Sequence, residues 1–132
     1  MTRGKVVLVP FPFDDLSTQK ARPAVCLTEP FTSHRHIVLA FVTSRAPDEP
    51  LETDVVLDPQ DPGFAQTGLD VRSTIRIHRL LTVASTIIKR ELGSLSPGLR
   101  ARVADAVHQL FALNREDASG GGAEIEVPPE AR

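Results

Sequence analysis

A continuous run of apolar residues places the strongest constraint on how this chain folds. The segment Ile37–Thr43 (IVLAFVT) carries no polar side chain before its last position. A strand of this kind must be buried on both faces, so it belongs in the middle of a sheet. The chain has 132 residues, the length of one domain. The remaining elements must therefore surround and cover this central strand.

Shorter strand patterns lie before and after the central run, separated by polar loops that contain proline. Val6–Phe13 begins as a β-branched strand, and its two prolines make it bend or leave the sheet, because proline cannot donate to a ladder. Ala24–Thr28 and Asp54–Leu57 are predicted to be two further short strands. Val71–His78 alternates apolar and polar residues, which predicts a half-buried strand. Leu80–Val83 is predicted to be another short strand.

Helical patterns are confined to the C-terminal part. Ser85–Leu92 is predicted to form one or two helical turns ended by Gly93. A longer helix is predicted over residues 97–113, with Ser96 as N-cap and Pro97 at the first helical position. Its apolar stripe has helical spacing and consists of Leu99, Val103, Ala106, Val107, Leu110 and Leu113.

The order of these elements predicts a mainly β fold of the α+β class. Five or six short, mostly antiparallel strands followed by a helix fit a small curved sheet or barrel with the C-terminal helix packed on it. This domain is expected to cover residues 1–113. Residues 114–132 are acidic and rich in glycine and proline, and we expect them to form a disordered tail.

Composition narrows the range of functions. The chain has no Trp and no Tyr, which disfavours an aromatic stacking platform for single-stranded nucleic acid. The formal net charge of −2 argues against a general binder of polyanions. The charge is uneven, however, because residues 114–132 carry five acids against two arginines. The remaining body is close to neutral.

Cysteine content and hydropathy indicate in which cellular compartment the protein is expected. Cys26 is the only cysteine, which excludes an intrachain disulfide and a multi-cysteine zinc site. Its apolar neighbours predict a buried strand residue rather than a nucleophile. The apolar runs are too short to span a membrane, and the first one leads into acids rather than into a cleavage site. We therefore expect a cytoplasmic protein that does not bind a membrane.

The polar face of residues 71–78 holds the strongest chemical signal. Arg72, Arg76 and His78 are predicted to point the same way. One interpretation is a solvated face paired with nearby acids. The alternative is a phosphate site, because the planar arginine fork suits phosphate oxygens and a histidine can move a proton near neutral pH.

Other candidate residues are less specific. Arg22 precedes a buried strand, and Thr43 closes the central one, where sites are commonly built. The alternative interpretation of each residue is an ordinary position at a strand end. His34 and His36 are two residues apart, and two ligands alone make a weak metal site, so we interpret them as loop residues. The chain has no glycine-rich phosphate loop and no metal-ligand spacing.

Four segments together resemble the MazF/PemK family, the toxins of type II toxin–antitoxin modules. They are GKVVLVPFPFDDLSTQKARPAVCLT, IVLAFVTS, TGLDVRSTIRIHRLLTV and ELGSLS, in this order between residue 3 and about residue 113. The resemblance implies a small SH3-like β-barrel with helices that forms a homodimer. It implies an endoribonuclease, without metal or cofactor, that cuts single-stranded RNA, often mRNA, at short motifs. It also implies a cognate antitoxin as partner.

The resemblance also implies roles for individual residues. Arg22, in its Arg-Pro pair, and Thr43 match the active-site arginine and threonine, which would hold the phosphoryl oxygens. Arg76 matches an arginine that some members use to protonate the leaving oxygen. Since an arginine side chain keeps its proton up to about pH 12, we favour charge stabilisation for it. Contacts to RNA are expected from Gln19, Lys20, Ser44 and Arg72.

His78 departs from the family pattern. It stands where the family usually has an acid that acts as general base. Histidine can also accept the 2′-hydroxyl proton, so the departure is compatible with activity.

Two alternatives therefore remain beside the nuclease. One is a family member that binds antitoxin or RNA without cutting. The other is a toxin like CcdB, which uses a similar barrel to poison DNA gyrase through C-terminal residues that typically include Trp, absent here.

Overall fold

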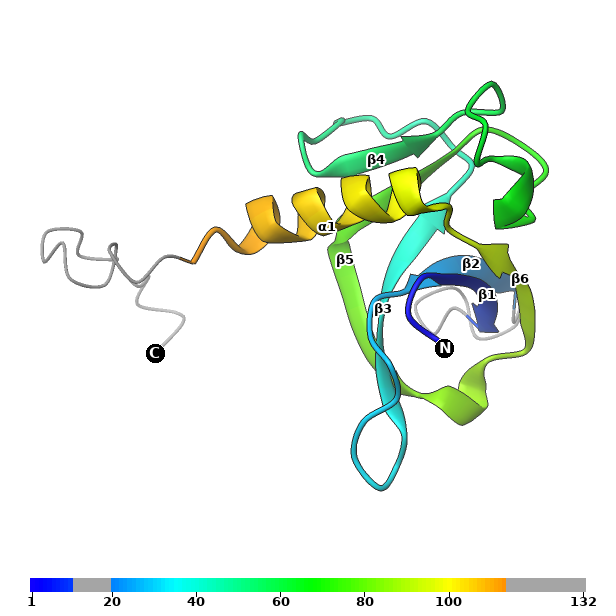
Figure 1. Cartoon of the computed structure of the whole chain (residues 1–132), viewed down its shortest axis with the longest axis vertical. Helices are drawn as coiled ribbons and strands as arrows, with labels where there is room; N and C mark the ends of the chain where they lie inside the picture. Colours follow the sequence, from blue (N-terminus) through cyan, green and yellow to red (C-terminus); the bar gives the residue numbers. More distant parts are fainter. Residues whose placement is uncertain (11–19, 114–132) are drawn as a thin grey trace, which may run out of the picture.

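The computed structural model describes residues 1–10 and 20–113. These residues form one curled sheet of six antiparallel strands, a half-barrel, with one α-helix against it (Figure 1). The strands are β1 (Lys5–Pro10), β2 (Ala21–Cys26), β3 (His36–Thr43), β4 (Asp54–Leu57), β5 (Ser73–Ala84) and β6 (Arg90–Ser94), in the spatial order β4-β5-β3-β2-β1-β6. The helices are η1 (Ala65–Thr67), η2 (Ser85–Ile87) and α1 (Pro97–Phe111). The predicted fold class is confirmed.

The apolar run predicted to be central forms β3, which pairs with β2 on one side and β5 on the other. Its side chains contribute to two cores. Ala40 and Val42 belong to a core that extends to α1, whereas Ile37, Leu39 and Phe41 belong to a second core. Burial on both faces explains why the run contains no polar residue before its end.

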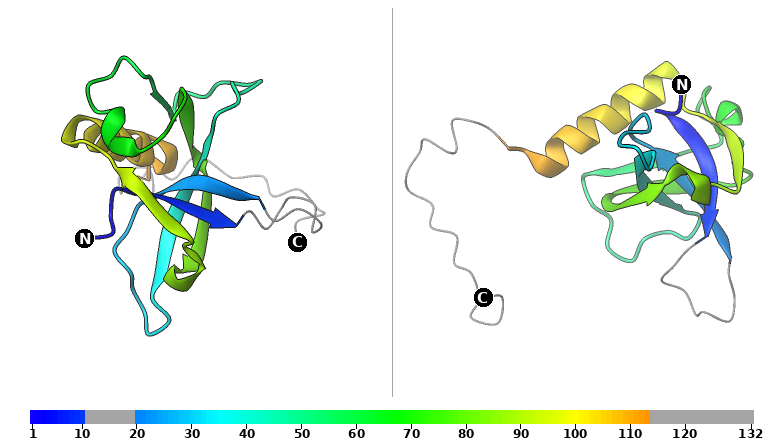
Figure 2. Two further views of the ribbon diagram at one scale, coloured as in Figure 1. Left: turned by 90° about the vertical axis from the view of Figure 1, so that its right-hand side faces the viewer. Right: turned by 90° about the horizontal axis from the view of Figure 1, so that it is seen from below.

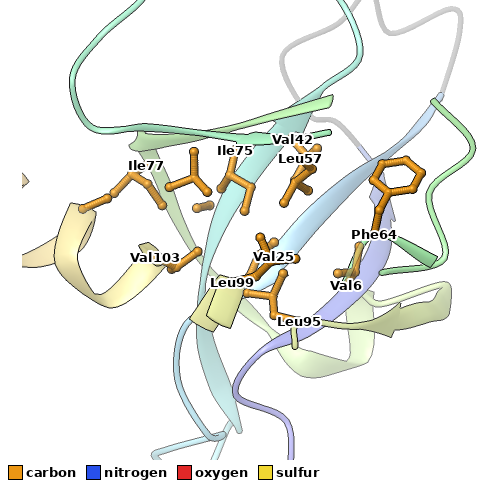
Figure 3. Packing of buried hydrophobic residues seen from close by; sticks show 13 residues of the cluster. Val6, Val25, Val42, Leu57, Phe64, Ile75, Ile77, Leu95, Leu99 and Val103 are labelled. Carbon is orange, nitrogen blue, oxygen red and sulfur yellow. The ribbon is translucent and has the colours of Figure 1, made fainter. Parts of the chain in front are cut away.

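Helix α1 covers one face of the sheet, where it packs on β4 and β5 (Figure 2). The Ser96 hydroxyl caps its first turn by accepting a hydrogen bond from the Leu99 N–H at 3.3 Å. Leu99 and Val103 point into the core beneath the helix (Figure 3), and Ala106 is buried in the same core. The apolar stripe ends before its predicted last member, because Leu113 is 87% exposed. Among the described residues, no helix is long and apolar enough to cross a membrane.

The helical turns predicted over Ser85–Leu92 are wrong for most of that segment. Only the short η2 is helical, and the chain then enters β6, which pairs with β1. Tertiary pairing overrides the local signal here: the Lys89 N–H donates to the Leu8 carbonyl at 2.9 Å. Gly93 is not a helix cap either. It lies within β6, where an added Cβ would collide with the backbone of Gln66 and Thr67.

The two strands predicted over residues 71–83 are a single strand with a large bulge. Ala40 of β3 pairs with Leu80, but the next residue, Phe41, pairs with Arg76. The three residues 77–79 of β5 therefore have no register partner on β3. A bulge bends its strand and redirects side chains. This one lies where β3 approaches its C-terminal end.

Candidate active site

An open hollow of about 580 Å³ lies where β2, β3 and β5 meet the loop that follows β3. Among the described residues, its lining includes four arginines and a histidine but only one acid, Asp48. The residues that matter for its chemistry are Arg22, Thr43, Arg45, Arg76, His78 and Arg79. We call this the arginine hollow. Such a concentration of cationic N–H donors suits the oxygens of a phosphate group.

All four residues to which the sequence assigned catalytic roles line the arginine hollow. Arg22 comes from β2, Thr43 from the end of β3, and Arg76 and His78 from β5. Arg22 and His78 are exposed, so a bound molecule can reach them. Three different strands thus bring these side chains to one place.

The bulge in β5 explains how neighbouring residues reach the same hollow. In a regular strand, His78 and Arg79 would point to opposite faces. Both lie in the unpaired segment 77–79, and both line the arginine hollow. The Arg79 guanidinium also lies 5.9 Å from the centre of the Phe41 ring, at cation–π range.

Arg76 is held against the wall of the hollow by a buried acid. Its Nε atom lies 3.1 Å from Oδ1 of Asp54, and their side chains are only 16% and 6% exposed. The Nε–H is not aligned with that oxygen, so the contact is an ion pair without a hydrogen bond. The Nη2 group of Arg76 donates to the Glu49 carbonyl at 3.4 Å. The guanidinium therefore contacts both β4 and the loop before it.

Thr43 shapes the turn that follows β3. Its Oγ1 accepts a hydrogen bond from the Arg45 N–H at 3.1 Å and lies 3.4 Å from the Arg45 carbonyl oxygen, to which it donates. This short turn brings Arg45 to the hollow. The second hydrogen bond is long, so the hydroxyl can be drawn to a better acceptor.

Sequence reasoning missed Arg45 and Arg79. Arg45 follows directly after Thr43 and Ser44, and this position next to two candidate residues could have indicated that Arg45 belongs to the site. Arg79 was hidden because period-two alternation places it on the face opposite His78. Only the bulge, which depends on pairing with β3, brings it to the same side as His78.

The residues predicted to contact RNA lie in different places. Ser44 and Arg72 line a second hollow of about 390 Å³, which shares residues 45–47 with the first. Arg72 precedes β5, is exposed and pairs with Asp58 at 3.2 Å. The strand pattern predicts that Arg72, Arg76 and His78 point the same way, but Arg72 does not line the arginine hollow with the other two. Lys20 is exposed just before β2 and lines neither hollow. Gln19 and the predicted tail, residues 114–132, lie outside the described residues.

The remaining candidates are structural. Cys26 is buried, as predicted, and burial raises the pKa of its thiol from 9.0 to about 11, so it is no nucleophile at neutral pH. His34 and His36 lie near the other end of β3, with ring centres 5.7 Å apart. The described part of the chain contains no group of three or more His, Cys, Asp or Glu that could hold a metal ion.

A curled antiparallel half-barrel with one C-terminal helix and a cationic hollow at its strand ends defines the class of this protein. A family model described as the PemK-like, MazF-like toxin of type II toxin–antitoxin systems matches residues 2–111. The chain therefore belongs to this toxin family, which confirms the resemblance seen in its motifs. Toxins of the MazF family are in general endoribonucleases. No curated protein matches the chain significantly.

Solved structures share the fold at low sequence identity. The Mycobacterium tuberculosis toxin MazF-mt6 is 22% identical, with a TM-score of 0.63 over 83% of this chain and 98% of that chain. A MazE–MazF structure from Deinococcus radiodurans is 18% identical, with a TM-score of 0.63 over 86% and 97%. A mycobacterial endoribonuclease in complex with its cognate antitoxin is 16% identical, with a TM-score of 0.62 over 86% and 97%.

Proposed function

We propose that this toxin is an endoribonuclease that cuts single-stranded RNA, such as mRNA, at short sequence motifs in the arginine hollow. The observation that carries the proposal is the gathering of four arginines, His78 and Thr43 around one open hollow. The body of the protein is nearly neutral, so this concentration is local. Membership of the toxin family supports the same function.

The reaction is a transesterification within the RNA strand. The 2′-oxygen forms a bond to the adjacent phosphorus, and the bond from phosphorus to the 5′-oxygen breaks. The products are a 2′,3′-cyclic phosphate and a 5′-hydroxyl. Negative charge builds on the phosphoryl oxygens in the transition state, and fixed cationic donors can stabilise it without a metal ion.

Each side chain has a proposed task in this reaction. Arg22 and the Thr43 hydroxyl donate to the phosphoryl oxygens, and Thr43 gives up its long bond to the Arg45 carbonyl to do so. His78 accepts the 2′-hydroxyl proton; no other described side chain forms a hydrogen bond or ion pair with it. Arg76 stabilises charge on the leaving oxygen, which takes its proton from water.

The proposal extends to partners and compartment. A cognate antitoxin binds this toxin, and the toxin acts as a homodimer in the cytoplasm, where it meets mRNA. Support for the antitoxin comes from two structures of the same fold, the MazE–MazF structure from Deinococcus radiodurans and the mycobacterial endoribonuclease with its cognate antitoxin.

The test is cleavage of several long single-stranded RNAs in EDTA by antitoxin-free protein. We expect the wild-type chain to cut, and Arg22→Ala to cut at least about 100-fold more slowly, the usual cost of a lost oxyanion donor. Arg90→Ala is the control, because Arg90 is exposed on β6 and lines neither hollow. We expect it to cut at the wild-type rate.

Two results would contradict the proposal. If the wild-type chain leaves every RNA intact, the protein is a binding toxin, and a gyrase supercoiling assay then tests the CcdB-like alternative. If cutting stops in EDTA and returns with a divalent cation, the reaction depends on a metal.

A further inference from the structure

The buried acid beside Arg76 has no task in the reaction described above. Asp54 is the first residue of β4, and it is the register partner of Arg76 on β5. Its side chain is 6% exposed, and its Oδ1 lies 3.1 Å from the Arg76 Nε. Burying a carboxylate is costly unless it is paired and hydrogen-bonded. We therefore ask which interactions stabilise the buried Asp54 carboxylate and what they do for the site.

The carboxylate is fixed on both sides. Oδ2 of Asp54 accepts a hydrogen bond from the Leu51 N–H at 2.8 Å, and the Asp54 N–H donates to the Leu51 carbonyl at 3.0 Å. Oδ1 faces Arg76. Asp54 thus joins the loop before β4 to the central part of β5, and its rotamer is set by the backbone of that loop.

These contacts fix one side of the Arg76 guanidinium. The Nε edge of Arg76 faces Asp54, and Nη2 donates to the Glu49 carbonyl. Nη1 forms no hydrogen bond with the described residues, and Arg76 lines the arginine hollow. Without Asp54, rotation about the side-chain bonds would let the guanidinium leave this orientation.

We propose that Asp54 is a positioning residue for RNA cleavage, which orients the Arg76 guanidinium towards the scissile phosphate. This inference rests on the proposed endoribonuclease function. Asp54 acts through Arg76 and does not itself touch the substrate, because its carboxylate is enclosed by Leu51 and Arg76. A misplacement of about 1 Å in such a group is enough to cost about a hundredfold in rate.

The first variant is Asp54→Asn, which keeps the shape and the acceptor for the Leu51 N–H but removes the charge. We expect kcat to fall roughly ten- to a hundredfold, with a much smaller change in KM, because the group acts in the transition state. The matched control is Glu91→Gln, which removes the charge of an exposed pair with Lys5 at 3.1 Å. It should cut like the wild-type protein.

A double-mutant comparison separates positioning from a merely structural role. In an Arg76→Gln background, Asp54→Asn should lower kcat little further, since the two residues act together. Arg76→Lys provides an independent readout if Asp54→Asn fails to fold, because it keeps both the charge and Asp54 but lacks the planar fork. We expect it to lose kcat to a similar extent as Asp54→Asn.

The outcomes are distinguishable. Wild-type protein that does not cut RNA overturns the proposed function and this inference with it. Cutting by the wild type, together with an unchanged kcat in Asp54→Asn or Arg76→Lys, overturns the inference alone. So does an equal loss from Asp54→Asn with and without Arg76, because Asp54 would then act through the fold.

Discussion

At residue 78 the chain carries an exposed imidazole in the bulged segment of β5. A positioned general base contributes about 10²- to 10⁴-fold to the rate. We therefore expect His78→Ala to slow RNA cleavage by about that factor, measured under single-turnover conditions. His108→Ala is the control, because His108 is exposed on α1 and lines neither the arginine hollow nor its neighbour. Full activity of His78→Ala would remove the histidine from the mechanism.

A second prediction at this scale concerns Cys26 and the pH dependence of stability. Burial raises the pKa of its thiol to about 11 in the folded protein, against an ordinary value of 9.0. The folded state therefore keeps a proton that the unfolded chain loses between these values. The free energy of unfolding should decrease as pH rises above about 9, by up to about 1.4 kcal/mol per pH unit from this group.

Urea denaturation between pH 8 and pH 10.5 measures this effect. The comparison is with Cys26→Ala, whose lost side-chain packing lowers stability equally at every pH. The wild-type protein should lose stability more steeply than the variant over this range. Parallel curves for the two proteins would contradict the predicted proton linkage.

At the scale of elements, two glycines in different surroundings form a matched pair: Gly68, which follows η1 and lies against β6, and Gly98 in α1. Gly68 follows η1 with φ of 74°, and an added Cβ would collide with the Leu92 carbonyl. Gly98 lies in the first turn of α1, with no atom within 4 Å of an added Cβ. Gly68→Ala should lower the free energy of unfolding by more than about 1 kcal/mol. Gly98→Ala should leave it unchanged or raise it by up to about 1 kcal/mol.

The midpoints and slopes of urea denaturation report both changes. A lower free energy of unfolding in Gly68→Ala, together with an unchanged or higher one in Gly98→Ala, supports the described contact between residue 68 and β6. If both substitutions shift stability in the same direction, that contact is wrong.

At the scale of the whole molecule, the charge is local rather than global. The net charge is −2, yet the arginine hollow collects four arginines. RNA binding should therefore depend on a few phosphate contacts, each contributing about 0.7 to the slope of log K against log salt. Arg45→Ala should weaken binding and lower that slope by about this amount, whereas Arg90→Ala should not.

RNA that is methylated at every 2′-oxygen allows this measurement, because it cannot undergo the proposed attack. Affinities at several salt concentrations give the slope for each protein. An unchanged slope in Arg45→Ala would place the RNA backbone away from the arginine hollow.

The sequence predicts those parts of the fold that depend on residues close together in the chain, and it fails where the pairing of distant strands decides the structure. The apolar run at residues 37–43, the Ser96 cap and the buried Cys26 follow from neighbouring residues, and their structures agree. The helical turns over Ser85–Leu92 fail because pairing with β1 decides that segment. The bulge at residues 77–79 and the contact of Asp54 with Arg76 depend on strand register, which no local pattern encodes.

The residues of the candidate site also fall into those that the sequence predicts and those that only the pairing and turns of the fold reveal. Arg22, Thr43, Arg76 and His78 were identified by family motifs and chemistry, and they line one hollow. Arg45 and Arg79 were missed because a turn and a bulge bring them there. Catalytic roles for these residues remain predictions.

The most direct test of the central claim is the chemical identity of the RNA ends. Mass spectrometry of fragments produced by the wild-type protein in EDTA identifies them. We predict a 2′,3′-cyclic phosphate on one fragment and a 5′-hydroxyl on the other, because the 2′-oxygen is the nucleophile. A 3′-hydroxyl with a 5′-phosphate would require water as the nucleophile and would contradict the mechanism proposed for the arginine hollow.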